Sequence, residues 1–258
     1  MRKTFAAAEY VFKQSFRNKM LNVLIIFAVM AMGFSFFISE LAQEVEMKMI
    51  KDFGLFAINI FAFLTLALSL TIQMFEETEL KTLFMVIVKP IKRSEFIIGK
   101  YLGIIATIGM NMLLMFITLM IIIAVKGGNP WDIDLFVSVV MTFAGIAVLS
   151  SAGLLFSVIA TSVPGAVIYL FLVYVLGHIT VHLKNIVDKL DSVLLKVLTD
   201  IMYYLVPNLQ LFNFKDRITS GLGGSDAGYA VFVVLYAVSY IAVMLVITGA
   251  VFKRKEFF

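Results

Sequence analysis

The chain has 258 residues, of which 62% are hydrophobic and 15% charged, with a formal net charge of +4 and a mean hydropathy of +1.02. Soluble domains are close to half apolar and a quarter charged, so this composition excludes an ordinary water-soluble domain. The apolar runs are continuous rather than alternating, which favours membrane helices over a β-barrel. We therefore expect an all-α, polytopic membrane protein that forms a single domain over residues 1–258.

Residues 1–19 predict an amphipathic helix that lies in the headgroup region before the chain turns into the membrane. Its apolar side chains recur near one helical face, at Phe5, Ala8, Phe12 and Phe16. Arg17 and Lys19 lie off that face and are candidate membrane-surface anchors. A simple interfacial anchor and a role in gating are both compatible with this pattern.

Six apolar segments are long enough to cross a hydrocarbon core of about 30 Å. They are Met20–Ile38, Gly54–Met74, Ile97–Val125, Leu135–Ala160, Gly165–His182 and Gly228–Phe252. An even number of spans puts both termini on one side. That side carries thirteen Lys and Arg against six acids, and the other carries eight against eleven. The positive-inside rule then predicts cytoplasmic termini in a multi-pass protein of the cell membrane.

The link between the second and third spans, residues 75–96, begins with the carboxylates Glu76, Glu77 and Glu79. They predict the start of a short helix, because acids suit the positive end of a helix dipole, and Pro90 predicts its end. Lys81 lies on this helix, and Lys92 and Arg93 follow it at the membrane surface. The segment could be a platform for lipid headgroups or a docking point for a soluble partner.

Polar residues inside the spans are few, and none in the middle of a span is ionisable. Lys100 is close enough to the cytoplasmic end to snorkel to the surface. Hydrogen bonds between helices are the expected role of the strongest polar groups at depth, which are Asn59, Asn111, Ser150 and Ser151. The spacing of Gly99 and Gly103 predicts a close helix contact, with chance occurrence as the alternative.

Chemical motifs are weak or absent in this sequence. His178 and His182 share a helical face, but two ligands without an acidic neighbour indicate interfacial imidazoles more than a metal site. Gly99-Lys100 is not a phosphate-binding loop, because Ser94 stands in place of the first glycine and Tyr101 in place of the Ser or Thr that binds magnesium. With no nucleophile and base at depth, we expect neither an intramembrane enzyme nor a cofactor or metal in this chain.

The long outer connection, residues 183–227, contains apolar residues at alternating spacings of four and three. They are Leu183, Val187, Leu190, Leu194, Val197 and Ile201. This spacing predicts an amphipathic helix that lies on the outer leaflet or packs on a neighbour.

Residues 75–100 resemble the cytoplasmic coupling segment of type-2 ABC exporter permeases. The resemblance rests on an acidic start, Thr82-Leu83, an apolar stretch and then Pro90-Ile-Lys-Arg-Ser-Glu-Phe-Ile-Ile-Gly-Lys100. The surface helix before the first span, the six spans and the long outer connection are similar to that family as well. Residues 205–213, Leu-Val-Pro-Asn-Leu-Gln-Leu-Phe-Asn, resemble a segment of permeases similar to that of the nitrous oxide reductase maturation exporter.

The resemblance implies a prokaryotic exporter in which two permease copies, or a copy and a homologue, work with separate cytoplasmic ABC ATPase subunits. ATP and Mg²⁺ would bind to those subunits, and no nucleic-acid partner is expected. The implied docking residues are Glu76, Glu77, Glu79 and Lys81. By resemblance, an outer gate would contain Tyr203, Tyr204, Pro207, Phe212 and Phe214. The apolar spans fit an amphipathic substrate. The alternative is a membrane anchor or assembly factor that docks a soluble complex through the same segment.

Overall fold

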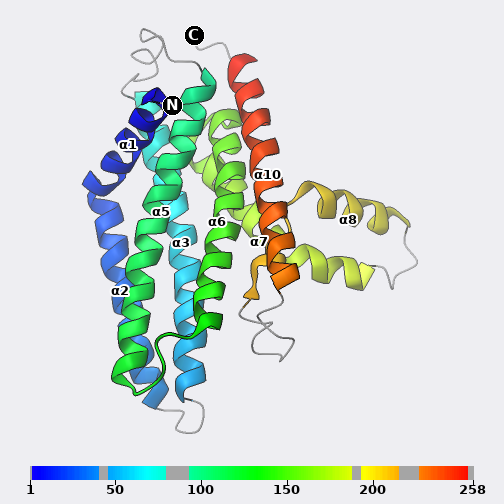
Figure 1. Cartoon of the computed structure of the whole chain (residues 1–258). Helices are drawn as coiled ribbons and strands as arrows, with labels where there is room; N and C mark the ends of the chain where they lie inside the picture. Colours follow the sequence, from blue (N-terminus) through cyan, green and yellow to red (C-terminus); the bar gives the residue numbers. More distant parts are fainter. Residues whose placement is uncertain (1, 41–45, 80–92, 188–192, 215–226, 255–258) are drawn as a thin grey trace.

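The computed structural model of the chain describes residues 2–40, 46–79, 93–187, 193–214 and 227–254, which are helical apart from short connections (Figure 1). The elements are α1 (Arg2–Arg17), α2 (Lys19–Glu40), α3 (Glu46–Glu79), α5 (Arg93–Val125), α6 (Ile133–Ile159), α7 (Val163–Val187), α8 (Val193–Leu205), the 3-10 helix η1 (Leu209–Phe212) and α10 (Ala227–Arg254). No strand occurs in these ranges. The all-α prediction is therefore confirmed for the described residues.

Four helical segments are long and apolar enough to cross a membrane: Glu46–Met74, Ser94–Val125, Ile133–Ile159 and Gly228–Lys253. A fifth is added if the segments Thr4–Arg17 and Leu21–Phe34, which are bent by 68°, form one broken span. The apolar section of α7, Val163–Ile179, is shorter. The described residues thus support a polytopic protein with four or five spans, and six spans remain a prediction.

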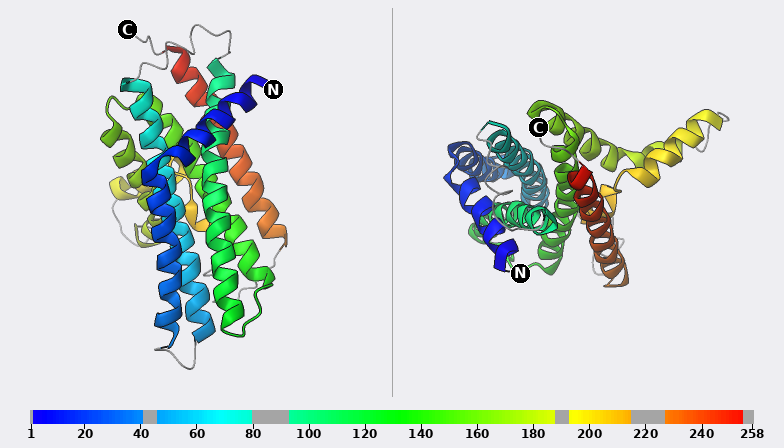
Figure 2. Two further views of the ribbon diagram at one scale, coloured as in Figure 1. Left: turned by 90° about the vertical axis from the view of Figure 1, so that its left-hand side faces the viewer. Right: turned by 90° about the horizontal axis from the view of Figure 1, so that it is seen from above.

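Helices α2, α3, α5 and α6 run side by side as a bundle (Figures 1 and 2). Helix α6 is central, because it contacts α3, α5, α7 and α10. Small residues allow this: a Cβ added at Gly153 would lie 2.6 Å from Leu70 Cδ1 of α3 and 3.0 Å from Leu170 Cδ1 of α7. Close packing of small residues is a main source of helix association in membranes.

The hydroxyl groups of α6 bond to carbonyl oxygens of the same helix. Ser150 Oγ donates to Ile146 O at 2.7 Å, and Ser151 Oγ donates to Val148 O at 2.6 Å. Ser138, Thr142 and Ser157 make the same kind of bond. The prediction that Ser150 and Ser151 link helices is therefore wrong, since a hydroxyl in a helix has a carbonyl acceptor of its own within reach.

Two ion pairs tie the helices together at the end of the bundle away from α1. Lys51 Nζ of α3 lies 2.5 Å from Asp132 Oδ2, and Lys126 Nζ lies 2.5 Å from Glu46 Oε1. Asp132 is also the N-cap of α6, because its other oxygen accepts the backbone N–H of Asp134 at 3.0 Å. The bond from Lys51 holds the pKa of the Asp132 carboxyl below its ordinary value. The start of α6 is thereby fixed to α3.

The end of α7 and α8 form an arm that extends away from the bundle (Figures 1 and 2). The two helices contact each other, and Lys184 Nζ pairs with Asp200 Oδ1 at 2.8 Å. Leu183 and Val187 belong to α7, whereas Val197 and Ile201 belong to α8. The prediction of one continuous amphipathic helix is therefore wrong, because these residues lie on two helices; Leu190 lies outside the described residues. The arm exposes some of these apolar side chains, because Leu194 is 70% exposed.

Candidate functional site

The amphipathic helix α1 packs across the first turns of α5 (Figure 2). Two glycines allow the close approach, because a Cβ added at Gly99 would lie 2.6 Å from Ala7 Cβ, and one at Gly103 would lie 2.6 Å from Val11 Cβ. The predicted close contact of this glycine pair is therefore confirmed, with α1 as the partner. Val11 is buried, whereas Phe5 is 72% exposed and does not pack into the bundle.

The predicted surface anchors Arg17 and Lys19 lie at the bend between α1 and α2. Arg17 is the last residue of α1, Lys19 is the first residue of α2, and both are exposed. A change of direction by 68° at this point turns the chain from a helix that lies across α5 to one that runs along the bundle. Their place at the bend is compatible with a membrane surface there.

The ends of α3 and α10 and the start of α5 lie at the same end of the bundle as α1 (Figure 1). The backbone of α3 continues as helix through Glu76 and Glu77 to Glu79. The prediction that these carboxylates begin a separate helix is therefore wrong: they lie in the last turn of α3, since no Gly or Pro interrupts the helix there. Arg93 begins α5, whereas Lys81 and Lys92 lie outside the described residues.

Lys100 does not reach the surface by the predicted snorkelling. The residue is 4% exposed, two turns into α5, because helices packed at this end of the bundle cover it.

Two of the predicted hydrogen bonds between helices are confirmed within the bundle. Asn111 Nδ2 of α5 donates to Thr65 Oγ1 of α3, and Asn59 Oδ1 of α3 accepts from Tyr174 Oη of α7 at 3.2 Å.

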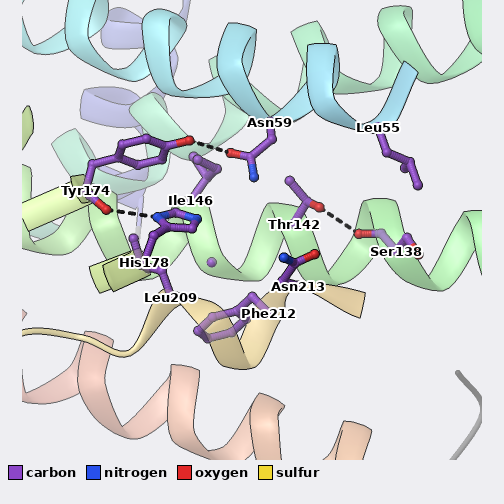
Figure 3. Close-up of a pocket in the computed structure, with 11 residues that line it drawn as sticks. Leu55, Asn59, Ser138, Thr142, Ile146, Tyr174, His178, Leu209, Phe212 and Asn213 are labelled. Carbon is purple, nitrogen blue, oxygen red and sulfur yellow. Dashed lines mark hydrogen bonds between the residues drawn. The ribbon is translucent and has the colours of Figure 1, made fainter. Parts of the chain in front are cut away.

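A polar cavity of about 50 Å³ lies between α3, α6, α7 and η1 (Figure 3). Its lining combines apolar walls with amides, hydroxyls and an imidazole. The residues are Leu55, Asn59, Ser138, Thr142, Gly145, Ile146, Tyr174, His178, Leu209, Phe212 and Asn213. None of them is Asp, Glu, Lys or Arg. A concave, mostly apolar site with a few convergent polar groups is the usual form of a ligand site.

Aromatic stacking fixes the wall of the cavity that α7 contributes. The Tyr174 ring lies 4.3 Å from that of Phe63 and 4.6 Å from that of His178, centroid to centroid. His178 Nδ1 lies 2.9 Å from the carbonyl oxygen of Tyr174. These contacts hold the tyrosine hydroxyl against Asn59 and turn the imidazole toward η1 (Figure 3).

The segment from Pro207 to Asn213 forms the cavity's remaining side and is held by tyrosines of α10. Tyr236 Oη accepts the backbone N–H of Asn208 at 3.0 Å, and Tyr229 Oη donates to Leu211 O at 3.1 Å. Asn208 caps η1, because its Oδ1 accepts the backbone N–H of Gln210 at 3.1 Å. Both tyrosines therefore link the position of α10 to the shape of the cavity.

The structure separates the five predicted outer-gate residues into two groups. Pro207, Phe212 and Phe214 are buried where this segment joins the bundle, and Phe212 lines the cavity. Tyr203 and Tyr204 belong to α8 in the arm, where Lys184 Nζ lies 4.5 Å from the centroid of the Tyr203 ring. Whether either group acts as a gate remains a prediction.

Among the described residues, no three His, Cys, Asp or Glu side chains are grouped as metal ligands. His178 faces the polar cavity, and His182 lies four residues further along α7. Sequence reasoning missed the cluster of Asn59, Tyr174 and His178, because its members come from two helices with no shared motif. The only local signal was the presence of polar residues within apolar helices.

Comparison with protein families matches residues 12–257 to the family described as ABC-2 family transporter protein. A comparison with curated proteins gives no match.

Proposed function

Because the chain belongs to the ABC-2 family of transporter proteins, we propose that it is the permease subunit of an ABC exporter, which couples ATP hydrolysis by separate ATPase subunits to outward transport. The observation that carries this proposal is the family match, which covers nearly the whole chain. The permease itself would perform no bond chemistry. ATP and Mg²⁺ would be bound by the ATPase subunits, and two permease copies, or one copy and a homologue, would form the transport unit.

The end of the bundle that contains α1 and the last turn of α3 is the proposed docking side. Three carboxylates within four residues, Glu76, Glu77 and Glu79, give this end a negative cluster for basic groups of an ATPase, and Lys81 would add a cation. Docking here would place the ATPase beside the crossing of α1 and α5. Movement of the motor could then be transmitted through α1 and α3 to the spans. Lys92 and Arg93 would anchor the segment at the membrane surface.

In the proposed orientation, this docking side and both termini lie in the cytoplasm of a prokaryotic cell. Lys and Arg exceed acids on this face, which is the bias expected of a cytoplasmic surface. The segment of residues 205–213, with Pro207, Phe212 and Phe214, would then lie toward the outer side and, with Tyr203 and Tyr204, contribute to an outer gate. Its likeness to permeases similar to that of the nitrous oxide reductase maturation exporter is part of the same proposal.

The proposal is tested by coexpressing the permease with its candidate ATPase and reconstituting the complex in lipid nanodiscs. The triple variant Glu76→Gln, Glu77→Gln, Glu79→Gln should insert and purify in the normal amount but recover less ATPase, and permease-dependent ATP hydrolysis should fall several-fold. The matched control neutralises three carboxylates of the outer connection, Asp188→Asn, Asp191→Asn and Asp226→Asn, and should bind the ATPase as the native chain does.

Normal ATPase binding and coupling in the triple variant would reject the docking residues. A complex that binds an ATPase but never moves any compound across a sealed vesicle would favour the alternative of a membrane anchor. These two outcomes are distinguished by measuring hydrolysis and vesicle uptake on the same preparation.

A further inference from the structure

The polar cavity between α3, α6, α7 and η1 presents a hydrogen-bond acceptor in a fixed direction. His178 Nδ1 lies 2.9 Å from the Tyr174 carbonyl oxygen, which can only accept, so Nδ1 carries the proton. In the neutral ring, Nε2 is then unprotonated and can only accept. Figure 3 shows this second ring nitrogen turned toward the space that the lining residues enclose.

The same cavity presents a donor from α3. Tyr174 Oη donates to Asn59 Oδ1 at 3.2 Å, which fixes the orientation of the amide and leaves its NH₂ group on the other side. In Figure 3 the amide nitrogen is turned away from Tyr174 and toward the interior. A ligand atom in this space would therefore meet an N–H donor from α3 and an imidazole acceptor from α7.

Two hydroxyl oxygens of α6 are further acceptors in the lining, which also contains the amide of Asn213. Ser138 Oγ donates to Asp134 O and Thr142 Oγ1 donates to Ser138 O, both at 2.8 Å. Since each proton is used within α6, the oxygen lone pairs remain the groups that a ligand could meet. With His178 Nε2 they are acceptors that a proton-bearing ligand group could satisfy, while the amides of Asn59 and Asn213 can donate to the same group.

Charge and size restrict the ligand further. No lining residue is Asp, Glu, Lys or Arg, so an ionic group in this cavity would lack a counter-charge, which is unfavourable. The cavity of about 50 Å³ exceeds the roughly 10–15 Å³ that one water needs, but it is too small for a whole lipid headgroup. A single hydroxyl-bearing carbon fits these limits, because a hydroxyl donates and accepts through one atom.

We propose that this cavity binds a hydroxyl group of an uncharged amphipathic molecule, with His178 Nε2 accepting from the hydroxyl and Asn59 Nδ2 donating to it. The assignment of that molecule as the exported substrate rests on the proposed function, whereas the binding itself does not. Inside the cavity the hydroxyl-bearing carbon would contact Leu55, Ile146 and Leu209, and the rest of the ligand would remain outside it.

The test uses the full permease without any ATPase, in nanodiscs, with its histidines labelled with ¹⁵N. The chain has two histidines, so His182→Gln leaves His178 as the single imidazole signal. Three probes share an oleoyl chain: 1-monooleoylglycerol has hydroxyl donors, methyl oleate has acceptors only, and oleate is charged. The unliganded spectrum should show the Nδ1–H tautomer, and 1-monooleoylglycerol alone should shift the Nε2 resonance in a saturable way.

Variants separate recognition from a general effect of lipid. Asn59→Leu removes the donor and should weaken the binding of 1-monooleoylglycerol at least tenfold. Tyr174→Phe should weaken this binding less, because the variant keeps the Asn59 amide and loses only the hydroxyl that orients it. Asn22→Leu, which removes an exposed amide on α2, should bind as the native chain.

The proposal is overturned by an Nε2–H tautomer in the unliganded protein, by an equal response to methyl oleate, or by unchanged binding in both Asn59→Leu and Tyr174→Phe. Any of these results leaves the exporter assignment intact, since no ATPase is present. Loss of ATPase coupling in the acidic triple variant would likewise leave this site intact.

Discussion

The crossing of α1 over α5 makes a sharp prediction for Gly99 and Gly103. In the variants Gly99→Ala and Gly103→Ala, the new Cβ would lie 2.6 Å from Ala7 Cβ and Val11 Cβ, respectively. Each added atom would also lie 2.8 Å from a backbone oxygen of α1. Because backbone cannot rotate aside as a side chain can, α1 must move outward by most of the 0.8 Å that separates 2.6 Å from ordinary contact at 3.4 Å.

The magnitude follows from two opposing effects. Overpacking of this kind costs about 1–3 kcal/mol, whereas replacing glycine by alanine within a helix gains about 0.8–1.0 kcal/mol. The net destabilisation is therefore about 1 kcal/mol for each site. For a protein of this size that corresponds to a fall in melting temperature of about 2–4 °C for each substitution.

The assay is thermal unfolding of the detergent-solubilised permease, followed by size-exclusion chromatography after heating. Gly33→Ala and Gly249→Ala are matched controls, because a Cβ at either position meets nothing within 4 Å. They should be neutral or stabilising. Because Ala7→Gly removes the nearer clash but itself loses about 0.8–1.0 kcal/mol of helix propensity, the double variant Ala7→Gly, Gly99→Ala should be less destabilised than the sum of the two single variants. If Gly99→Ala and Gly103→Ala are as stable as the two controls, α1 does not pack on α5 as described.

Two further predictions concern polar contacts. The pair with Lys51 stabilises only the ionised carboxylate of Asp132, and it therefore lowers the pKa of that group in the folded protein below the ordinary value of 3.8. The stabilisation should be complete above pH 3.8 and should be lost as the pH drops through the lowered pKa of the folded state. The melting-temperature advantage of the native chain over Asp132→Asn, which retains a capping side chain, should be small at pH 6 and should vanish near pH 2; a constant difference would contradict this. At depth, Thr65→Val should cost more stability in unfolding titrations than the double variant Thr65→Val, Asn111→Leu, since the single change leaves the Asn111 amide buried without a partner. An additive result from the double-mutant cycle would argue against the bond.

Element positions were well predicted, because hydrophobicity over some twenty residues is a strong and local signal. Five of the six predicted spans lie within a helix, the span Leu135–Ala160 extends one residue past the end of α6, and residues 1–19 contain the helix α1. Errors occurred where a boundary depends on weak signals. The charge of Glu76, Glu77 and Glu79 predicts a helix start, but α3 continues through these residues because no Gly or Pro interrupts it.

Tertiary partners were less predictable than elements. The pair Gly99 and Gly103 indicated a close contact, yet spacing within one helix cannot specify which helix approaches. Residues 183–201 had a continuous apolar spacing that suits one helix, whereas the structure distributes them between α7 and α8, which lie against each other. A periodic pattern does not report a reversal of chain direction unless turn residues mark it.

The candidate cavity shows the same limitation at the level of single residues. Asn59 was recognised as a residue that bonds between helices, and the bond to Tyr174 agrees. The role of His178 depends on a carbonyl one turn earlier and on a segment more than thirty residues later, neither of which is marked by a motif. Phe212 was proposed for a gate by resemblance, and its place in the cavity lining came only from the structure.

The internal bonding of the α6 hydroxyls has a consequence for how the chain is made. Helix α6 is synthesised before α7 and α10, although both later pack against it. Were Ser150 and Ser151 dependent on those partners, α6 would leave the translocon with polar groups unmatched in lipid. Since each hydroxyl already donates to a carbonyl of its own helix, α6 can be stable in the bilayer as an independent segment before α7 and α10 have been inserted.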